Sequence, residues 1–199
     1  MFLRLFQDSL MALFLSRLPM KGIVFTQFIS MVSELYGEDL IDDVLDSLNL
    51  ESGGAYTSVG TYPHQELVVI LSATCEKTKV TPSQMLEQFG GFLLLVFREK
   101  FPEFFASHSD PLSFLERVDD YVHVEVYKLY PDAELPRFEC RRLGTDELQM
   151  DYRSSRHLHY LALGLIKECI KSYGAQGTVS FEEIPSTLGP VIRFKIQLS

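Results

Sequence analysis

Residues 114–140 read FLERVDDYVHVEVYKLYPDAELPRFEC, and this stretch decides how the middle of the chain folds. Apolar residues recur in it every three to four positions, which is the period of an amphipathic helix, and Ser109-Asp110-Pro111 before it is a typical helix start. Pro131 cannot continue a helix, so the sequence predicts one helix from Leu112 to Tyr130 with His123 near its middle. The apolar stripe of this helix consists of Leu112, Leu115, Val118, Val122, Val126 and Leu129.

The rest of the chain divides by periodicity into a helical front and a mixed rear. Helical spacing predicts helices at Phe25–Leu35, Glu38–Leu48, Glu66–Cys75, from Thr81-Pro82 to Phe97, and at Leu158–Tyr173. Alternation of apolar and polar residues predicts strands at Glu147–Tyr152, Thr178–Ile184 and Val191–Leu198. The pair Gly90-Gly91 inside a helix marks a hinge or a close contact. Helices followed by an antiparallel sheet make an α+β fold.

Composition excludes several classes of function. The formal net charge of −9 and a pI of about 5.0 make a nucleic-acid partner unfavourable, because phosphate backbones would be repelled. No apolar run approaches the roughly 20 residues that span a bilayer, so we expect no membrane insertion. Three scattered cysteines, Cys75, Cys140 and Cys169, fit a reducing compartment, and we expect a cytoplasmic protein.

The first 19 residues stand apart from the rest. They are rich in Leu and Phe, yet Asp8 interrupts them and they have no small-residue cleavage site, so they make a poor signal peptide. The following MKGIVF, residues 20–25, looks like a natural start. We therefore interpret residues 1–19 as an upstream extension or an accessory amphipathic helix, and residues 20–199 as one domain.

Motifs of common enzymes are missing. The sequence has no phosphate-binding Gly-rich loop, no HExxH and no Gly-x-Ser-x-Gly. His157 and His159 are two residues apart and would diverge on a helix, so surface histidines are the better interpretation. His123 is different because it lies beside an apolar stripe, one turn from Asp119. It is either a hydrogen-bonded structural histidine or a metal ligand whose second nitrogen binds a neighbouring group.

A second group of polar residues lies in DYRSSR, residues 151–156. In an extended segment, Tyr152, Ser154 and Arg156 would point to the same side. Two hydroxyls and a guanidinium side by side match a ligand that bears a carboxylate. A polar strand end with an N-cap serine is the alternative interpretation of this motif taken alone.

Together these features resemble the heme-nitric oxide/oxygen binding (H-NOX) family, which is related to the heme domain of soluble guanylate cyclase. The resemblance runs from Met20 to Ser199 and includes MKGIVF, the Gly90–Phe97 segment, the stretch quoted first and DYRSSR. It implies an N-terminal helical subdomain, a C-terminal subdomain with an antiparallel sheet, and heme b between them. It implies His123 as the iron ligand, Tyr152, Ser154 and Arg156 as the clamp on the heme propionates, and Pro136 against the porphyrin. The implied pocket lining is Ile23, Val24, Phe28, Leu93, Phe97 and Leu161.

The resemblance also implies which gas binds. Family members that hold oxygen stably have a distal tyrosine where this chain has Leu161, and the supporting polar positions are Phe28 and Leu93 here. Because bound oxygen needs a hydrogen-bond donor and nitric oxide does not, we expect a nitric oxide sensor that also binds CO. Tyr160 is adjacent, but one residue turns a helical side chain by roughly 100°, so its hydroxyl should miss the ligand.

The resemblance to this family also implies how the signal is passed on. Nitric oxide is expected to weaken the bond between iron and His123, and a histidine kinase or a cyclic-di-GMP enzyme is the expected partner. Cys140 matches one ligand of a zinc site found in some relatives, but the other ligands are missing, so we expect no zinc. Three alternatives stay open: an oxygen sensor of the same fold, a heme enzyme, and a thiol redox switch. A heme enzyme would need a distal acid–base residue, and the aligned positions supply none. A thiol redox switch would need a lowered thiol pKa, which nothing near the cysteines favours.

Overall fold

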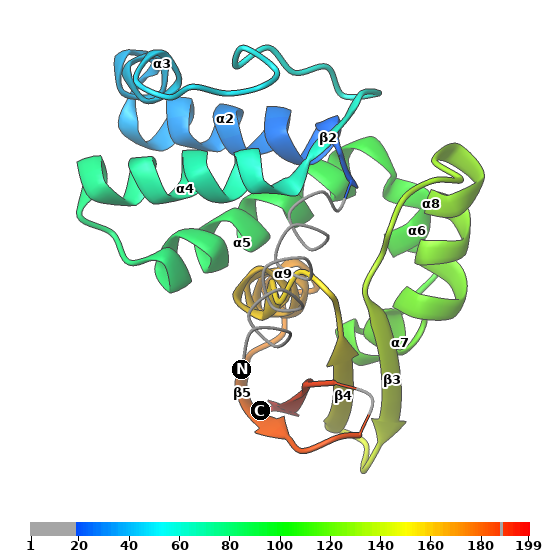
Figure 1. Ribbon diagram of the computed structural model, residues 1–199. Helices are drawn as coiled ribbons and strands as arrows, with labels where there is room; N and C mark the ends of the chain where they lie inside the picture. Colours follow the sequence, from blue (N-terminus) through cyan, green and yellow to red (C-terminus); the bar gives the residue numbers. More distant parts are fainter. Residues whose placement is uncertain (1–18, 188) are drawn as a thin grey trace, which may run out of the picture. The chain divides into compact units, whose positions relative to one another are not determined.

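The computed structural model describes residues 19–187 and 189–199. The chain divides into two compact units, with the boundary between Met85 and Leu86. The first unit is helical and the second contains a four-stranded sheet, as the α+β prediction requires (Figure 1). Apart from Pro19, the segment interpreted as an extension lies outside the described residues.

The first unit consists of helices tied together by a short strand pair. Strand β1 (Pro19–Lys21) pairs antiparallel with β2 (Thr61–Pro63), and the helices are α2 (Gly22–Tyr36), α3 (Glu38–Asp46) and α4 (His64–Thr78). At the start of α2, a Cβ on Gly22 would lie 1.9 Å from the carbonyl oxygen of Thr57, so only glycine fits. Helix α5 (Pro82–Lys100) begins in this unit, and the Thr81 hydroxyl caps it by accepting from the Gln84 N–H at 3.3 Å, as its sequence predicts.

The second unit is built on an antiparallel sheet with strand order β3-β4-β6-β5. Its strands are β3 (Arg137–Arg142), β4 (Glu147–Arg153), β5 (Gly177–Ile184) and β6 (Val191–Leu198). Helices α7 (Pro111–Glu116) and α9 (His159–Ser172) pack on one face, where alternate strand residues such as Met150 and Phe194 are buried (Figure 1). The opposite face is charged: Arg193 binds both carboxylate oxygens of Asp151, at 2.7 and 2.6 Å.

The helix predicted from Leu112 to Tyr130 is interrupted. Helix α7 ends at Glu116, a π-helix follows at Val118–Val122, and α8 spans His123–Leu129. The N–H of Val122 donates to the carbonyl of Arg117, five residues back, at 3.3 Å. The extra residue in this turn changes the phase of the apolar stripe, and Leu129 at its end is 59% exposed. Helix α6 (Pro102–Ala106) precedes this region.

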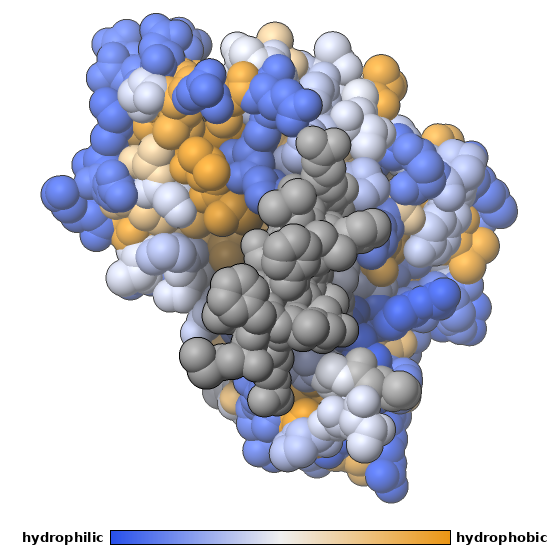
Figure 2. Space-filling model, in the orientation of Figure 1, coloured by the Kyte–Doolittle hydropathy of each residue, from blue (hydrophilic) through white to orange (hydrophobic). Residues whose placement is uncertain are grey.

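The surface of the described residues is mixed in polarity. Figure 2 shows apolar side chains over the region of α2 and α4. Two apolar residues of α4, Val68 and Val69, are about half exposed. Among the described residues, none of the helices is both long enough and apolar enough to cross a membrane.

Candidate functional site

His123 is the first residue of α8, directly after the π-helix, and its side chain is only 14% exposed. Its Nδ1 lies 3.3 Å from Oδ1 of Asp119. Burial lowers the pKa of His123, and the Asp119 carboxylate opposes this only in part, so the imidazole is neutral near pH 7. A carboxylate can only accept, so Nδ1 carries the hydrogen and Nε2 keeps its lone pair. That is the state in which an imidazole ligates a metal.

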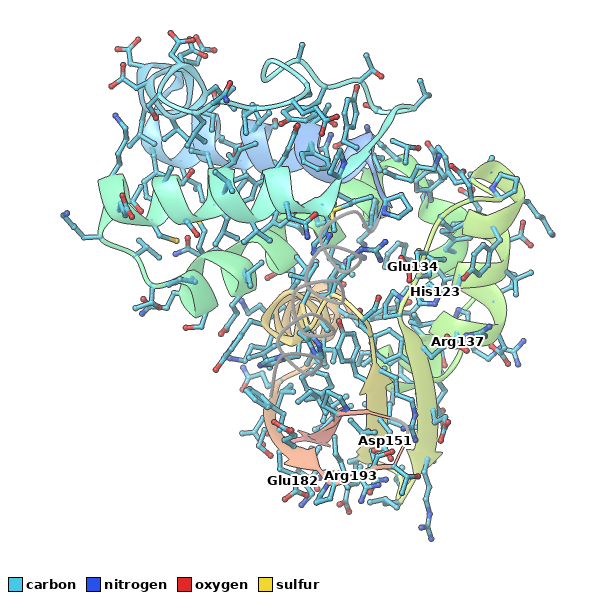
Figure 3. The ribbon with its side chains drawn as sticks, in the orientation of Figure 1. His123, Glu134, Arg137, Asp151, Glu182 and Arg193 are labelled. Atoms are coloured by element: carbon cyan, nitrogen blue, oxygen red, sulfur yellow. The ribbon has the colours of Figure 1, made fainter. Side chains whose placement is uncertain are left out.

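Asp119 holds more than the imidazole. Its Oδ1 also accepts from the backbone N–H of Phe138 at 3.2 Å, and its Oδ2 lies 3.5 Å from Nη1 of Arg137. In Figure 3, His123 and Arg137 lie where β3 begins, beside α8. One carboxylate therefore fixes the imidazole and ties its helix to the edge strand of the sheet.

A row of aromatic rings leads from His123 into the core of the second unit. The His123 ring lies 5.9 Å from the Phe138 ring, which lies 5.4 Å from Tyr152, and Tyr152 contacts Phe194 at 6.3 Å. Tyr152 is one of the residues predicted to bind a carboxylate. The row thus places the candidate ligand and the candidate clamp on one packed surface.

The clamp residues do not lie on one extended segment, so that prediction is wrong beyond Arg153. Strand β4 ends there, and the chain turns: the Arg156 N–H donates to the Ser154 hydroxyl at 3.2 Å, and His157 has a φ of +54°. The turn still gathers the trio. Burial raises the pKa of Tyr152, while a hydrogen bond with Ser154 and the charge of Arg156 partly oppose the increase. The phenol is therefore a hydrogen-bond donor at neutral pH.

Arg156 is buried, with 6% of its side chain exposed, and it already holds a carboxylate. Its Nη2 donates to Oε2 of Glu134 at 2.9 Å, and its Nη1 donates to the Glu134 carbonyl at 2.6 Å. The Ser155 hydroxyl donates to the other carboxylate oxygen of Glu134 at 3.2 Å. Sequence reasoning missed Glu134, and the available signal was an acidic residue two positions before Pro136. This donor set fits a propionate.

The expected pocket residues are all apolar and lie in both units. In the first unit, Val24 and Ile23 of α2 are half-buried and Phe28 is fully buried. In the second unit, the corresponding residues are Leu93 and Phe97 of α5, Leu161 of α9, and the half-buried Pro136 before β3. Their side chains offer no hydrogen-bond donor.

Tyr160, the neighbour of Leu161, packs into the second unit. Its ring meets the Phe181 ring edge-on, with centroids 5.5 Å apart, and lies 4.4 Å from the ring of His159. The Tyr160 ring is therefore packed on the side of α9 that faces the sheet.

The sequence predicts a hinge or a close contact at Gly90-Gly91, and the structure shows a close contact at the first of these glycines. A Cβ on Gly90 would lie 2.2 Å from the Leu161 carbonyl oxygen, and one on Gly164 would lie 2.0 Å from the Glu87 carbonyl oxygen. At Gly91 the nearest atom would be a side-chain oxygen of Glu168 at 3.7 Å. Helices α5 and α9 therefore cross backbone against backbone at Gly90 and Gly164.

The cysteines are free and shielded. Burial, with nearby carboxylates, raises the pKa of Cys140 to about 12, and its Sγ lies 3.7 Å from the Leu115 carbonyl. Burial also raises the pKa of Cys169 to about 12 and that of Cys75. Within the described residues, no group of three or more His, Cys, Asp or Glu side chains is arranged to hold a metal ion. These are protonated thiols, which opposes the interpretation as a redox switch.

Comparison with solved structures supports the resemblance to the H-NOX family. The unliganded Fe(II) H-NOX protein from K. algicida superimposes with a TM-score of 0.84 and 33% identity, over 90% of this chain and 97% of that one. A second H-NOX structure, described as an oxygen-binding domain in its oxygen complex, has a TM-score of 0.77 and 26% identity, over 90% and 95% of the two chains.

Curated relatives are longer proteins. Two soluble guanylate cyclases of Caenorhabditis elegans, gcy-32 and gcy-34, are each 28% identical over 158 residues. The match covers 76% of this chain and 23% of each cyclase. The model of the haem-NO-binding family (HNOB) matches residues 21–181, which is most of the chain. With this match and the H-NOX fold, the chain belongs to the haem-NO-binding family.

Proposed function

We propose that the chain is a heme-based nitric oxide sensor and not an enzyme. The observation that carries the proposal is the buried, neutral imidazole of His123, whose Nδ1 is held by Asp119 so that Nε2 is left for iron. Tyr152, Ser154 and Arg156 supply two hydroxyls and a guanidinium for the propionates, and Pro136 lies in the loop between these two parts. The cofactor is heme b, because the cysteines lack the Cys-x-x-Cys-His spacing of covalent attachment.

The apolar lining favours nitric oxide over oxygen. Heme in the ferrous state supplies the iron that takes a diatomic ligand. An oxygen molecule held on iron would need a hydrogen-bond donor. The side chains that we expect around it, those of Val24, Phe28, Leu93, Phe97 and Leu161, would not offer one. The contacts of Tyr160 with Phe181 and His159 support the expectation that its hydroxyl does not take this role. Nitric oxide and CO bind without a donor.

The signal begins at His123. If the bond between His123 and iron were lost, α8 would be free to move at the end next to the π-helix, and the Asp119 contacts would carry the change to β3. A separate histidine kinase or cyclic-di-GMP enzyme reads it. The net charge of −9 argues against nucleic acid as partner, the three free thiols fit the cytoplasm, and we expect no zinc.

The test is the electronic spectrum of the purified ferrous protein. We expect five-coordinate heme that becomes a five-coordinate nitrosyl with nitric oxide. His123→Ala should lose the heme or the ligand-specific spectrum, whereas His108→Ala, which removes a half-buried histidine outside the clamp, should match the wild-type spectrum. A colourless wild type from heme-sufficient cells would refute the cofactor.

Oxygen sensing is the second candidate, and it is favoured only by the oxygen-binding relative. Exposure of the ferrous protein to air separates the two functions. A stable oxygen complex would replace nitric oxide selectivity with oxygen binding while leaving the heme site intact.

A further inference from the structure

Arg156 lies at the centre of a small ionic cluster that joins two loops. One loop, residues 130–136, connects α8 to β3 and contains Glu134 and Pro136. The other follows β4 and contains Ser155 and Arg156. Three hydrogen bonds connect them: two from the Arg156 guanidinium to the carbonyl and carboxylate of Glu134, and one from the Ser155 hydroxyl to that carboxylate. Glu134 is labelled beside His123 in Figure 3.

The chemistry of Glu134 is that of the expected ligand. A glutamate side chain is two methylene groups and a carboxylate, which is the same group as a propionate arm of heme. Its carboxylate binds Nη2 of Arg156 at 2.9 Å, in a place where only 6% of the arginine side chain is exposed. The Glu134 side chain is 42% exposed, so it can leave this position for water while the arginine stays.

We propose that Glu134 is an internal competitor for the propionate clamp: its carboxylate holds Arg156 until a heme propionate displaces it. This rests on the proposed function, since it concerns how the same site is loaded. Two carboxylates cannot share one buried guanidinium without repulsion, so the arrival of one disfavours the other. Displacement removes the two side-chain bonds that tie the loop with Pro136 to the clamp, while the bond from Arg156 to the Glu134 carbonyl remains. Loading of the clamp is thereby coupled to the segment that follows the His123 helix.

The contact of Arg156 with the Glu134 backbone allows two roles of the Glu134 side chain to be told apart: competition with the propionate, and positioning of Arg156. The bond from Nη1 to the Glu134 carbonyl does not depend on the side chain, so Glu134→Gln leaves the arginine anchored while removing the competing charge. Competition predicts that this variant binds hemin better than wild type. A positioning role predicts that it binds worse.

The experiment is titration of the apoprotein with hemin, followed by Soret absorbance and by stopped flow. For Glu134→Gln we expect the association rate and the affinity to rise by about tenfold. Thermal unfolding should show a less stable apoprotein and an unchanged hemin-loaded protein, because the ion pair exists only in the first. Glu139→Gln removes the same charge from the exposed side of β3 and should match wild type in both measurements.

Ser155→Ala is a second variant. It weakens the hold on the Glu134 carboxylate without changing Arg156 or Glu134. It should raise the association rate about twofold, since it removes one solvent-exposed hydrogen bond to the Glu134 carboxylate. Unchanged or weaker hemin binding in both variants overturns the competition. If wild type itself binds no hemin, the proposed heme function fails first, so the two failures are distinguishable.

Discussion

Asp119 is the residue through which His123, β3 and the π-helix are connected. Its carboxylate accepts from the imidazole and from a backbone N–H, and it pairs with Arg137. The partner on the far nitrogen of a ligating histidine sets its tautomer and its basicity. Asp119 therefore controls how well Nε2 donates to a metal, although it never contacts the metal itself.

Asp119→Asn tests this control. The amide keeps the shape but cannot accept as strongly, so we expect heme affinity to fall by about 10- to 100-fold. The rate of heme transfer to an excess of an apo heme protein measures it. Asp120→Asn is the matched control, because Asp120 is exposed and pairs with Arg117 at 3.0 Å. Equal heme retention in both variants would show that the Asp119 contact is not needed.

Glu66 in the first unit is a buried carboxylate, 7% exposed, with three donors. It accepts from the Ser52 N–H at 2.9 Å and from the Ser52 and Tyr56 hydroxyls at 2.6 Å each. Burial alone would raise the pKa of Glu66, but the hydrogen bonds outweigh it, and the pKa lies below the ordinary 4.5. The ionised network therefore stabilises the fold above the ordinary pKa, and that contribution disappears as the pH falls through the lowered pKa.

Glu66→Gln should lower the free energy of unfolding by about 1–3 kcal/mol at neutral pH. The difference from wild type should shrink as the pH drops below 4.5, the ordinary value. Urea unfolding at several pH values measures both effects. Glu76→Gln changes an exposed glutamate on the same helix and should leave the pH dependence as it is. A pH-independent loss in Glu66→Gln would assign the effect to shape and not to charge.

At the scale of elements, the crossing of α5 and α9 depends on the absence of two Cβ atoms. Gly90→Ala and Gly164→Ala would each place a methyl group against a backbone carbonyl, which cannot move without separating the helices. We expect each to cost about 1–3 kcal/mol of unfolding free energy.

Gly91→Ala is the internal control for these two changes. Its methyl group has room, and replacing a helical glycine by alanine adds up to about 1 kcal/mol, so this variant should be as stable as wild type or more so. Chemical denaturation of the three variants measures the order. If Gly91→Ala destabilises as much as its neighbour, then helix flexibility and not close contact explains the glycines.

The elements that can be predicted from sequence are those with a local sequence signal. Helix α5 is marked by a threonine cap and a proline at its start, and β6 by strict alternation. The edge strand β3 was missed because its outward residues are charged and its inward face, which ends in Arg142, has only Phe138 and Cys140 as apolar residues. The π-helix has no sequence signal either, since one additional residue between Arg117 and His123 looks like ordinary helical spacing.

The candidate site was predictable to a similar degree. The spacing of His123 and Asp119 is one helical turn, which sequence displays directly. The contact between Arg156 and Glu134 joins residues 22 apart through two loops, and loop geometry is fixed by tertiary packing that no local pattern encodes. The same limit explains why the turn at Ser154 replaced the extended segment that alternation suggested.

At the scale of the whole molecule, the two units differ in how they are held together. In the first, contacts run mostly between helices that follow one another, such as α2 with α3 and α3 with α4. In the second, β4 pairs with β6 across an intervening helix and strand, with Leu148 opposite Ile196. Proteins dominated by such distant pairings fold more slowly than helical ones, so we expect the second unit to limit folding.

The position of β6 has a consequence for biosynthesis. Residues 191–198 form an interior strand, yet both neighbours, β4 and β5, precede them in the chain. During translation those neighbours leave the ribosome first, and their edges that face β6 stay unpaired until β6 is made. Unpaired strand edges promote association with other nascent chains. Chaperones that shield unpaired strands would act during this interval, which ends when Val191–Leu198 clears the exit tunnel.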